Sequence, residues 1–249
     1  MLSKIIKYLV TFFFLLSAQA VSAAEPSGDL TLLFAKDKTR VYASYYRAMN
    51  NNPKIAILFH QAESNRMEYE PVLSLFHVAG FDTLTVDQRS GGTRWDADNM
   101  TVKRIGESAE YADAYPDMEA ALDYAIKRKY KSILLVGSSY SASLAIVMAS
   151  KHQDKITAVA AFSPGEYFPN KNRIKTAASR LKVPLYVTGA RKEIKRVEEV
   201  IINAGDDADI TFYRPVNSVH GVSSLRKDQN PDGYKANMEN FSNFVERFK

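Results

Sequence analysis

The chain has 249 residues, of which 46% are hydrophobic, and carries 33 lysine and arginine residues against 28 aspartate and glutamate residues. The resulting net charge of +5 is too small to favour nucleic-acid binding, so no nucleic-acid partner is expected. The sequence contains no cysteine, which excludes disulfide bonds and thiolate metal sites. Its length fits one α/β domain with a full hydrophobic core.

The first two dozen residues have the pattern of a bacterial Sec-type signal peptide. Lys4 and Lys7 precede the apolar run YLVTFFFLLSA, and small residues follow it at once. The run is shorter than the ~20 residues that span a bilayer, so no stable membrane span is expected after cleavage. We expect residues 1–24 to be the signal peptide and residues 25–249 to form the mature domain, which would be periplasmic or secreted.

Eight short apolar runs, rich in β-branched and aromatic residues, predict strands. The polar turn KDKT joins the first two runs, which favours a hairpin, and the later segments between strands are long enough for crossover helices. We therefore predict a single α/β domain with an eight-stranded, mostly parallel sheet flanked by helices. The predicted strands are 30–35, 41–48, 54–59, 81–87, 132–137, 157–163, 184–189 and 209–214.

Two segments carry clear helical patterns. Residues 115–129 begin with a proline and acidic residues, end with basic residues, and have one apolar stripe. Aromatic and aliphatic residues recur at helical spacing between Tyr234 and Phe248, which indicates a helix packed on the core. About twenty residues separate the sixth and seventh strands, too few for a cap domain. Ligands of such sheets bind beyond the carboxyl ends of the strands, so we expect the chemistry there.

The segment ILLVGSSYSAS, residues 133–143, predicts a nucleophile between a strand and a buried helix. A nucleophile on such a sharp turn needs small residues two positions before and two positions after it. Ser139 meets this requirement because Gly137 precedes it and Ser141 follows it, whereas Ser138 has Val136 behind it. Ser139 is therefore the predicted nucleophile, and Ser141 is interpreted as a small residue that lets the turn close.

A serine hydroxyl needs a base to remove its proton, and the chain has four histidines. His77 lies in a predicted helix and His152 in a charged helix end, so both are interpreted as structural or solvated. His60 ends the third predicted strand. His220 follows the last predicted strand in a loop rich in small residues, from which an imidazole can reach the carboxyl ends of the strands. We therefore predict His220 as the base.

Two carboxylates are candidates for the acid that orients the base. Glu193 follows the seventh predicted strand, 27 residues before His220, and is our first choice. Glu166 follows the sixth predicted strand and is the alternative acid.

The oxyanion of such a reaction needs two hydrogen-bond donors, each of which typically contributes about 3 to 4 kcal/mol. One predicted donor is the backbone N–H of Tyr140, at the start of the buried helix. The other should come from the loop after the third strand, where Ala62 is the best candidate and Gln61 the next.

The segments "HQ", "DQRSGG" and "GSSYS", followed by a late carboxylate and a late "HG", resemble the α/β-hydrolase superfamily. The resemblance is greatest to its dienelactone hydrolase-like and small bacterial esterase branch. It implies a Ser139–Glu193–His220 triad and an oxyanion loop at residues 60–62, and it implies a structural role for "DQRSGG". The sequence departs from the family pattern at Gln61 and Ser141, which replace glycines, and at Lys192, which fills the usual acid position.

These residues predict a serine hydrolase that cleaves a carboxylic ester or thioester through an acyl-enzyme. The expected partner is a small-molecule or surface-presented acyl substrate, and no segment predicts a metal or cofactor site. A peptidase or amidase, or an acyltransferase with the same triad, remains an alternative, as does a non-catalytic binding protein with this fold. The sequence does not indicate an oligomeric state.

Overall fold

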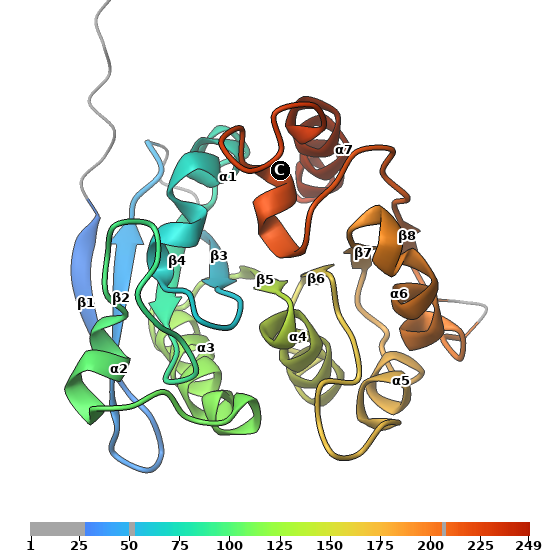
Figure 1. The fold of residues 1–249 in the computed structure, drawn as a ribbon. Coiled ribbons are helices and arrows are strands. Elements are labelled where there is room, and N and C mark those ends of the chain that lie inside the picture. The colour runs from blue at the N-terminus through green and yellow to red at the C-terminus, as the bar shows by residue number, and fades with distance from the viewer. Residues whose placement is uncertain (1–27, 50–52, 206–207) are drawn as a thin grey trace, which may run out of the picture.

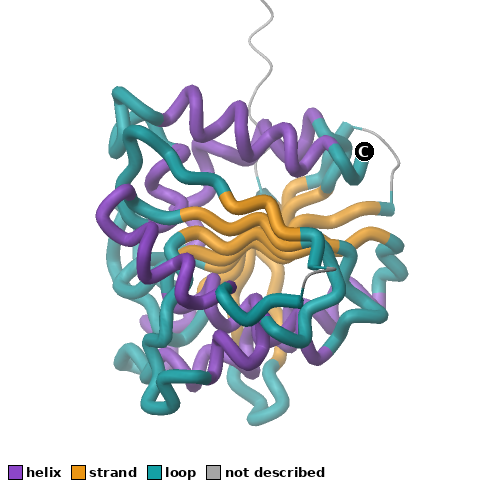
Figure 2. The backbone as a smooth tube through the Cα atoms, turned by 90° about the vertical axis from the view of Figure 1, so that its right-hand side faces the viewer, coloured by secondary structure: helices purple, strands orange, loops and turns teal. Residues whose placement is uncertain are grey.

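An eight-stranded sheet with helices on both faces forms the protein in the computed structural model (Figure 1). Figure 2 shows the strands as one twisted layer between two layers of helices. The structure describes residues 28–49, 53–205 and 208–249, so the predicted signal peptide lies outside the described residues. Within these ranges no helix has both the length and the apolar character needed to cross a membrane.

The strands follow the order β1-β2-β4-β3-β5-β6-β7-β8 across the sheet. Strand β2 pairs antiparallel with β1 and with β4, and the remaining neighbours are parallel. The predicted fold class is therefore confirmed, and each observed strand overlaps a predicted one. The strands are β1 (Asp29–Phe34), β2 (Arg40–Tyr46), β3 (Lys54–Phe59), β4 (Asp82–Asp87), β5 (Ser132–Ser138), β6 (Ala158–Phe162), β7 (Leu185–Thr188) and β8 (Ile210–Phe212).

The helices lie in the connections between strands and after β8. The predicted helix at 115–129 is observed as α3, which ends two residues early because Lys129 adopts the left-handed conformation (φ 61°) that terminates many helices. The α-helices are α1 (Leu73–Val78), α2 (Met100–Ile105), α3 (Tyr115–Lys127), α4 (Tyr140–Lys151), α5 (Arg173–Ala178), α6 (Ile194–Ile201) and α7 (Tyr234–Glu246). The 3₁₀ helices are η1 (Arg66–Val72), η2 (Tyr111–Ala114), η3 (Arg191–Glu193) and η4 (Gly221–Leu225).

The hydrophobic core has one cluster on each face of the sheet. Alternating residues of β3 divide between them: Ile55 and Ile57 face the helices α3 to α6, whereas Leu58 faces α1, α7 and η4. Full burial of an aliphatic or aromatic side chain of this kind contributes roughly 1.5–3 kcal/mol. Phe241 of the predicted C-terminal helix is buried in the second cluster, as its helical spacing predicted. The central strands are thus fixed from both faces, and their carboxyl ends are held rigidly.

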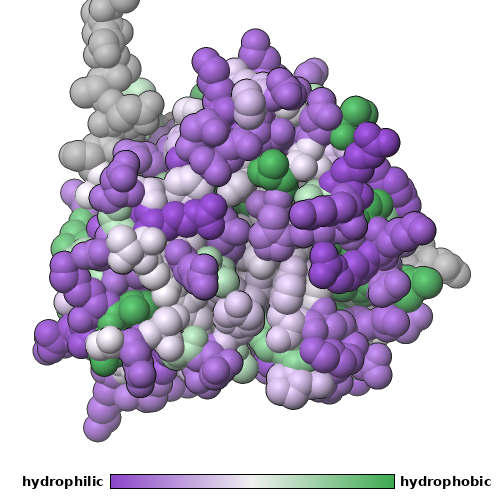
Figure 3. All heavy atoms as spheres, viewed as in Figure 1, coloured by the Kyte–Doolittle hydropathy of each residue, from purple (hydrophilic) through white to green (hydrophobic). Residues whose placement is uncertain are grey.

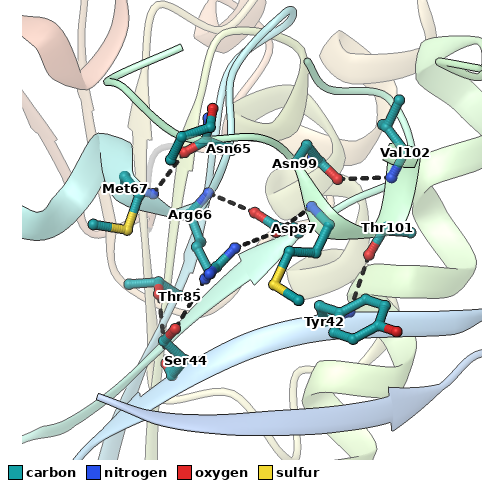
Figure 4. A network of polar contacts seen from close by, with 12 residues as sticks. Tyr42, Ser44, Asn65, Arg66, Met67, Thr85, Asp87, Asn99, Thr101 and Val102 are labelled. Carbon is teal, nitrogen blue, oxygen red and sulfur yellow. Dashed lines mark hydrogen bonds and ion pairs between the residues drawn. The ribbon is translucent and has the colours of Figure 1, made fainter. Parts of the chain in front are cut away.

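The loop after β4 is fixed by a network of polar contacts around the buried carboxylate of Asp87 (Figure 4). Asp87 accepts hydrogen bonds from the guanidinium of Arg66 at 2.6 Å, from the backbone N–H of Arg66 at 2.7 Å and from the backbone N–H of Met100 at 2.8 Å. Asn65 and Asn99 cap η1 and α2 through their side-chain oxygens. The contacts of Asp87, the first residue of "DQRSGG", fit the structural role that the resemblance implied.

Candidate active site

Ser139 occupies a strained turn between β5 and α4. Its backbone angles (φ 63°, ψ −122°) are rare for a residue with a side chain and are characteristic of a nucleophile elbow. Gly137 makes the turn possible, because a Cβ there would lie only 2.5 Å from the backbone of Ala142. The N–H of Ser139 donates to Phe162 O at 2.8 Å, so the turn is tied to the end of β6. The structure thus places Ser139 at the carboxyl edge of the sheet, 6% exposed.

Ser138 and Ser141, the two serines near the predicted nucleophile, form hydrogen bonds inside the protein. Ser141 Oγ accepts from Ser138 N–H at 2.9 Å and donates to Phe59 O at 2.8 Å, which ties the turn to the end of β3. The sequence predicted only that a small residue is required at this position. The Ser141 hydroxyl also stabilises the turn through these hydrogen bonds. Ser138 Oγ donates to the buried carboxylate of Glu68 at 2.7 Å.

His220 and Glu193 are brought together from two loops of the same edge. Glu193 ends η3, just after β7, and His220 follows β8 and precedes η4. His220 Nδ1 lies 2.8 Å from Glu193 Oε1. Burial opposes ionisation of Glu193, but the hydrogen bonds from His220 and Ser163 outweigh it and lower its pKa to about 2. An ionised Glu193 requires the proton on Nδ1, which leaves Nε2 of the neutral imidazole free to accept one.

Ser163 connects the acid to the loop that carries the base. This role was missed by the sequence reasoning. Its hydroxyl donates to Glu193 Oε2 at 2.7 Å and accepts from Gly221 N–H at 2.9 Å. Ser163 directly follows β6 and has a positive φ of 55°. Its place at the end of a predicted strand was the only signal in the sequence, and serines are too common at strand ends for that signal to identify it.

Glu166, the alternative acid, lies in the loop between β6 and α5. Its carboxylate accepts from Ile174 N–H at 2.9 Å and from Lys175 N–H at 2.8 Å, and so satisfies free donors of the first helical turn. The structure therefore brings Glu193, and not Glu166, to the imidazole of His220.

The loop after β3 runs beside the Ser139 turn because Phe59 pairs with Gly137 in the sheet. Gln61 N–H donates to Glu68 Oε2 at 2.9 Å and is therefore occupied. Ala62 N–H makes no hydrogen bond within the described part of the chain. Tyr140 N–H belongs to the first turn of α4, where no preceding helical carbonyl can accept it. Of the predicted donors, Tyr140 and Ala62 are thus the two available.

His60 anchors this loop from inside the protein. Its Nδ1 lies 2.7 Å from Gln61 O, and its Nε2 accepts from Gln88 N–H at 3.0 Å. Complete burial lowers the pKa of His60, so the ring is neutral and can accept through Nε2 while Nδ1–H donates. His60 therefore fixes the backbone just before Ala62.

Aromatic residues surround the candidate nucleophile and the adjacent loops. The hydroxyl of Tyr167 donates to Ser163 O at 2.8 Å; burial raises the pKa of Tyr167, and the neighbouring Ser139 side chain acts in the opposite direction. Tyr111 stacks on Tyr140 with ring centroids 4.8 Å apart. Trp95 donates to Ser64 Oγ at 2.9 Å, beside the loop that carries Ala62.

A surface pocket of about 540 Å³ lies against the base and the acid. Its lining includes Arg191, Lys192, Ser218 and Val219 besides Glu193 and His220.

Figure 3 shows strongly hydrophobic residues on this view only as small separate patches among hydrophilic ones. The visible surface therefore has no broad apolar area of the kind that marks a lipid or protein interface. Among the residues that the structure describes, no group of three or more histidine or acidic side chains could hold a metal ion.

Comparisons with known proteins relate the chain to others by structure only. No protein-family model and no curated protein matches the sequence. The esterase Pf2001 of Pyrococcus furiosus superposes with a TM-score of 0.64 and 16% identity, covering 89% of this chain and 90% of the esterase. Dienelactone hydrolase of Anabaena variabilis gives a TM-score of 0.66 and 13% identity, with coverages of 88% and 96%.

A monoacylglycerol lipase from Paleococcus ferrophilus gives a TM-score of 0.62 at 12% identity and covers 84% of this chain and 99% of its own. The three structures match over nearly their whole lengths, and all share the sheet with its flanking helices. The chain therefore has the α/β-hydrolase fold.

Proposed function

We propose that the protein is a serine hydrolase that cleaves a carboxylic ester or thioester. The observation that carries this proposal is the Glu193–His220 hydrogen bond of 2.8 Å, which lies at the same sheet edge as the strained Ser139 turn. A serine, a carboxylate and an imidazole, which follow one another in that order along the chain, are the parts of an acyl-transfer triad. Solved structures with this fold are named esterase, dienelactone hydrolase and monoacylglycerol lipase, which supports ester cleavage.

The reaction begins with the transfer of the Ser139 hydroxyl proton to His220 Nε2 as Oγ attacks the acyl carbon. Glu193 stabilises the imidazolium that forms, and the N–H groups of Tyr140 and Ala62 bind the oxyanion. The tetrahedral intermediate collapses, the acyl–oxygen or acyl–sulfur bond breaks, and His220 protonates the leaving alcohol or thiol. Water then attacks the acyl-enzyme by the same steps, releases the carboxylic acid and returns the proton to Ser139.

Among the described side chains, no hydrogen bond within 3.5 Å joins Ser139 to His220. Catalytic hydrogen bonds in free enzymes are commonly long and shorten when substrate binds. Rotation about the Cα–Cβ bond of Ser139 is the motion that we propose brings Oγ to the imidazole.

Labelling with a fluorophosphonate tests the proposal directly, because the reagent forms a bond only with an activated serine. We expect the wild-type protein to be labelled on Ser139, as mapped by mass spectrometry of the tryptic peptide. Ser139→Ala should not be labelled. Ser150→Ala, at the far end of α4, is the matched control and should be labelled at the wild-type rate. A wild-type protein that does not react would refute the proposed function.

Turnover assays distinguish the ester hydrolase from its alternatives. We expect hydrolysis of p-nitrophenyl acetate and of an acyl thioester, with little turnover of aminoacyl anilides. Faster cleavage of the anilides would assign the triad to a peptidase or amidase. Transfer of the acyl group to an added alcohol in preference to water would assign it to an acyltransferase.

We also propose that the mature domain acts outside the cytoplasm, as the leader pattern of residues 1–24 predicts. Expression of the full chain in a Gram-negative host, followed by fractionation and N-terminal sequencing, tests this. A protein recovered from the cytoplasm with Met1 intact would contradict the proposal.

A further inference from the structure

Glu68 is a fully buried carboxylate that lies next to the proposed catalytic groups without being one of them. It belongs to η1, and its exposed fraction is 0%. Its Oε1 accepts from Ser138 Oγ at 2.7 Å and from Gln61 Nε2 at 3.3 Å, and its Oε2 accepts from Gln61 N–H at 2.9 Å. Because a buried charge is unfavourable unless it is fully hydrogen-bonded, an acid at this position requires an explanation.

The three donors bring together the loops that carry the proposed chemistry. Gln61 precedes Ala62 in the oxyanion loop, and Ser138 precedes Ser139 in the nucleophile turn. Ser138 Oγ also accepts from Val222 N–H at 3.0 Å, two residues after His220. Gln61 Nε2 further donates to Ser223 Oγ at 3.3 Å. One carboxylate is therefore connected to the oxyanion loop and the nucleophile turn directly, and to the base loop through one intervening residue.

The nucleophile turn and the base loop leave no room between them for a side chain at residue 221. Gly221 has a φ of 66°, and a Cβ there would lie 2.4 Å from Ser138 Oγ. Val222 N–H, two residues after His220, donates to the same hydroxyl, so a shift of the Ser138 side chain would disturb the base loop. Glu68 fixes that hydroxyl by accepting its hydrogen bond.

We propose that Glu68 is a positioning residue that sets the relative placement of the oxyanion donor, the nucleophile and the base. By binding Gln61 N–H, it orients the peptide so that the next N–H, that of Ala62, is left for the oxyanion. A carboxylate accepts hydrogen bonds at both of its oxygens. An amide of the same shape, as in glutamine, would point its NH₂ group at one of the three hydrogen-bond donors around Glu68. The inference rests on the proposed hydrolase function, because it assigns a role in that reaction.

Glu68→Gln tests the proposal, with Asp82→Asn as the matched control. Asp82 is also buried and also accepts three hydrogen bonds, from Tyr45, Tyr130 and Ala48, but it begins β4 at the opposite edge of the sheet. Both substitutions remove a buried carboxylate charge with little change of volume. For each variant we measure the melting temperature, kcat and KM for p-nitrophenyl acetate, and the rate of fluorophosphonate labelling.

We expect Glu68→Gln to lower kcat by about 10- to 100-fold, the effect of misplacing reacting groups by about 1 Å, while KM changes little. The labelling rate should fall in parallel. Asp82→Asn should lower the melting temperature by at least as much and leave kcat within about twofold, because it disturbs no group that positions the reaction. A Glu68→Gln variant with the wild-type kcat and a lowered melting temperature would overturn the proposal, since the role would then be structural only.

Ser138→Ala decides the question if Glu68→Gln does not fold. This change removes one of the three donors and little volume, and we expect a kcat several-fold lower at an unchanged KM. An unchanged kcat would overturn the proposal. A wild-type protein that neither turns over esters nor reacts with the fluorophosphonate would instead refute the proposed hydrolase function, so the two failures are distinguishable.

Discussion

Two polar networks at the carboxyl ends of the strands, one after β4 and one after β7 and β8, differ in the partners of their carboxylates. Around Asp87, the partner is the guanidinium of Arg66, at 2.6 Å. At the candidate site, the partner of Glu193 is the imidazole of His220. Arginine keeps its proton under all ordinary conditions, whereas histidine exchanges its proton near neutral pH. The first network can therefore only hold the fold together, and the second can also move a proton.

The largest effects should follow from removing the groups that exchange the proton. We expect Ser139→Ala and His220→Ala each to lower kcat for an ester substrate by about 10⁶-fold, because the two act as a unit. The double variant should be no slower than either single one. Purified proteins with melting temperatures near that of the wild type are required for the comparison, and a single variant that retains one hundredth of the activity would contradict the triad.

The next largest effect should come from the acid. Glu193→Gln keeps the size of the side chain but removes the charge that fixes the tautomer of His220, and we expect kcat to fall by about 10⁴-fold. Glu166→Gln is the control, because its carboxylate meets backbone N–H groups of α5, and it should keep kcat within about threefold. A larger loss of kcat from Glu166→Gln than from Glu193→Gln would reverse the assignment of the acid.

Breaking the Asp87 network should affect stability and not chemistry. Asp87→Asn leaves the partly buried Arg66 guanidinium without its fully buried counter-charge, and we expect the free energy of unfolding to fall by about 3–5 kcal/mol. Urea titration measures this loss. The kcat per folded molecule should stay within about threefold of the wild type, and a selective loss of kcat without a loss of stability would show that the two networks are not separate.

The smallest effect is a dependence of stability on pH. The pKa of Glu193 is lowered from its ordinary 4.5 to about 2, so its ionised form is favoured by folding. The stability that it contributes is complete above about pH 5 and is lost as the pH falls towards 2. Melting curves of the wild type and Glu193→Gln should therefore show a difference that is largest near pH 6 and narrows between pH 4.5 and 2. A difference that is constant with pH would contradict the lowered pKa.

The sequence predicted the sheet well because each strand is a short apolar run bounded by polar residues. It also singled out Ser139, since the small residue required two positions earlier is present as Gly137. The order of the strands was less accessible: β4 lies between β2 and β3, which no local pattern reveals. The localisation and the substrate class stay predictions.

The polar groups behind the candidate triad could not be predicted, because their roles depend on contacts between distant segments. Glu193 and Glu166 both follow a strand at the same edge, and only the folded chain turns Glu166 onto α5. Glu68 lies in the polar stretch SNRMEYEP, which reads as a surface loop, and its donors come from residues 7 and 70 positions away. No spacing rule connects such residues.

The tight fit between Gly221 and Ser138 has an evolutionary consequence. A side chain at 221 would collide with the hydroxyl at 138, so a change at either position restricts what the other can be. Relatives of this chain that keep serine at the position of Ser138 should therefore keep glycine after their histidine. Where that glycine is lost, we expect the two positions to have changed together, and a set of homologous sequences would show it as covariation.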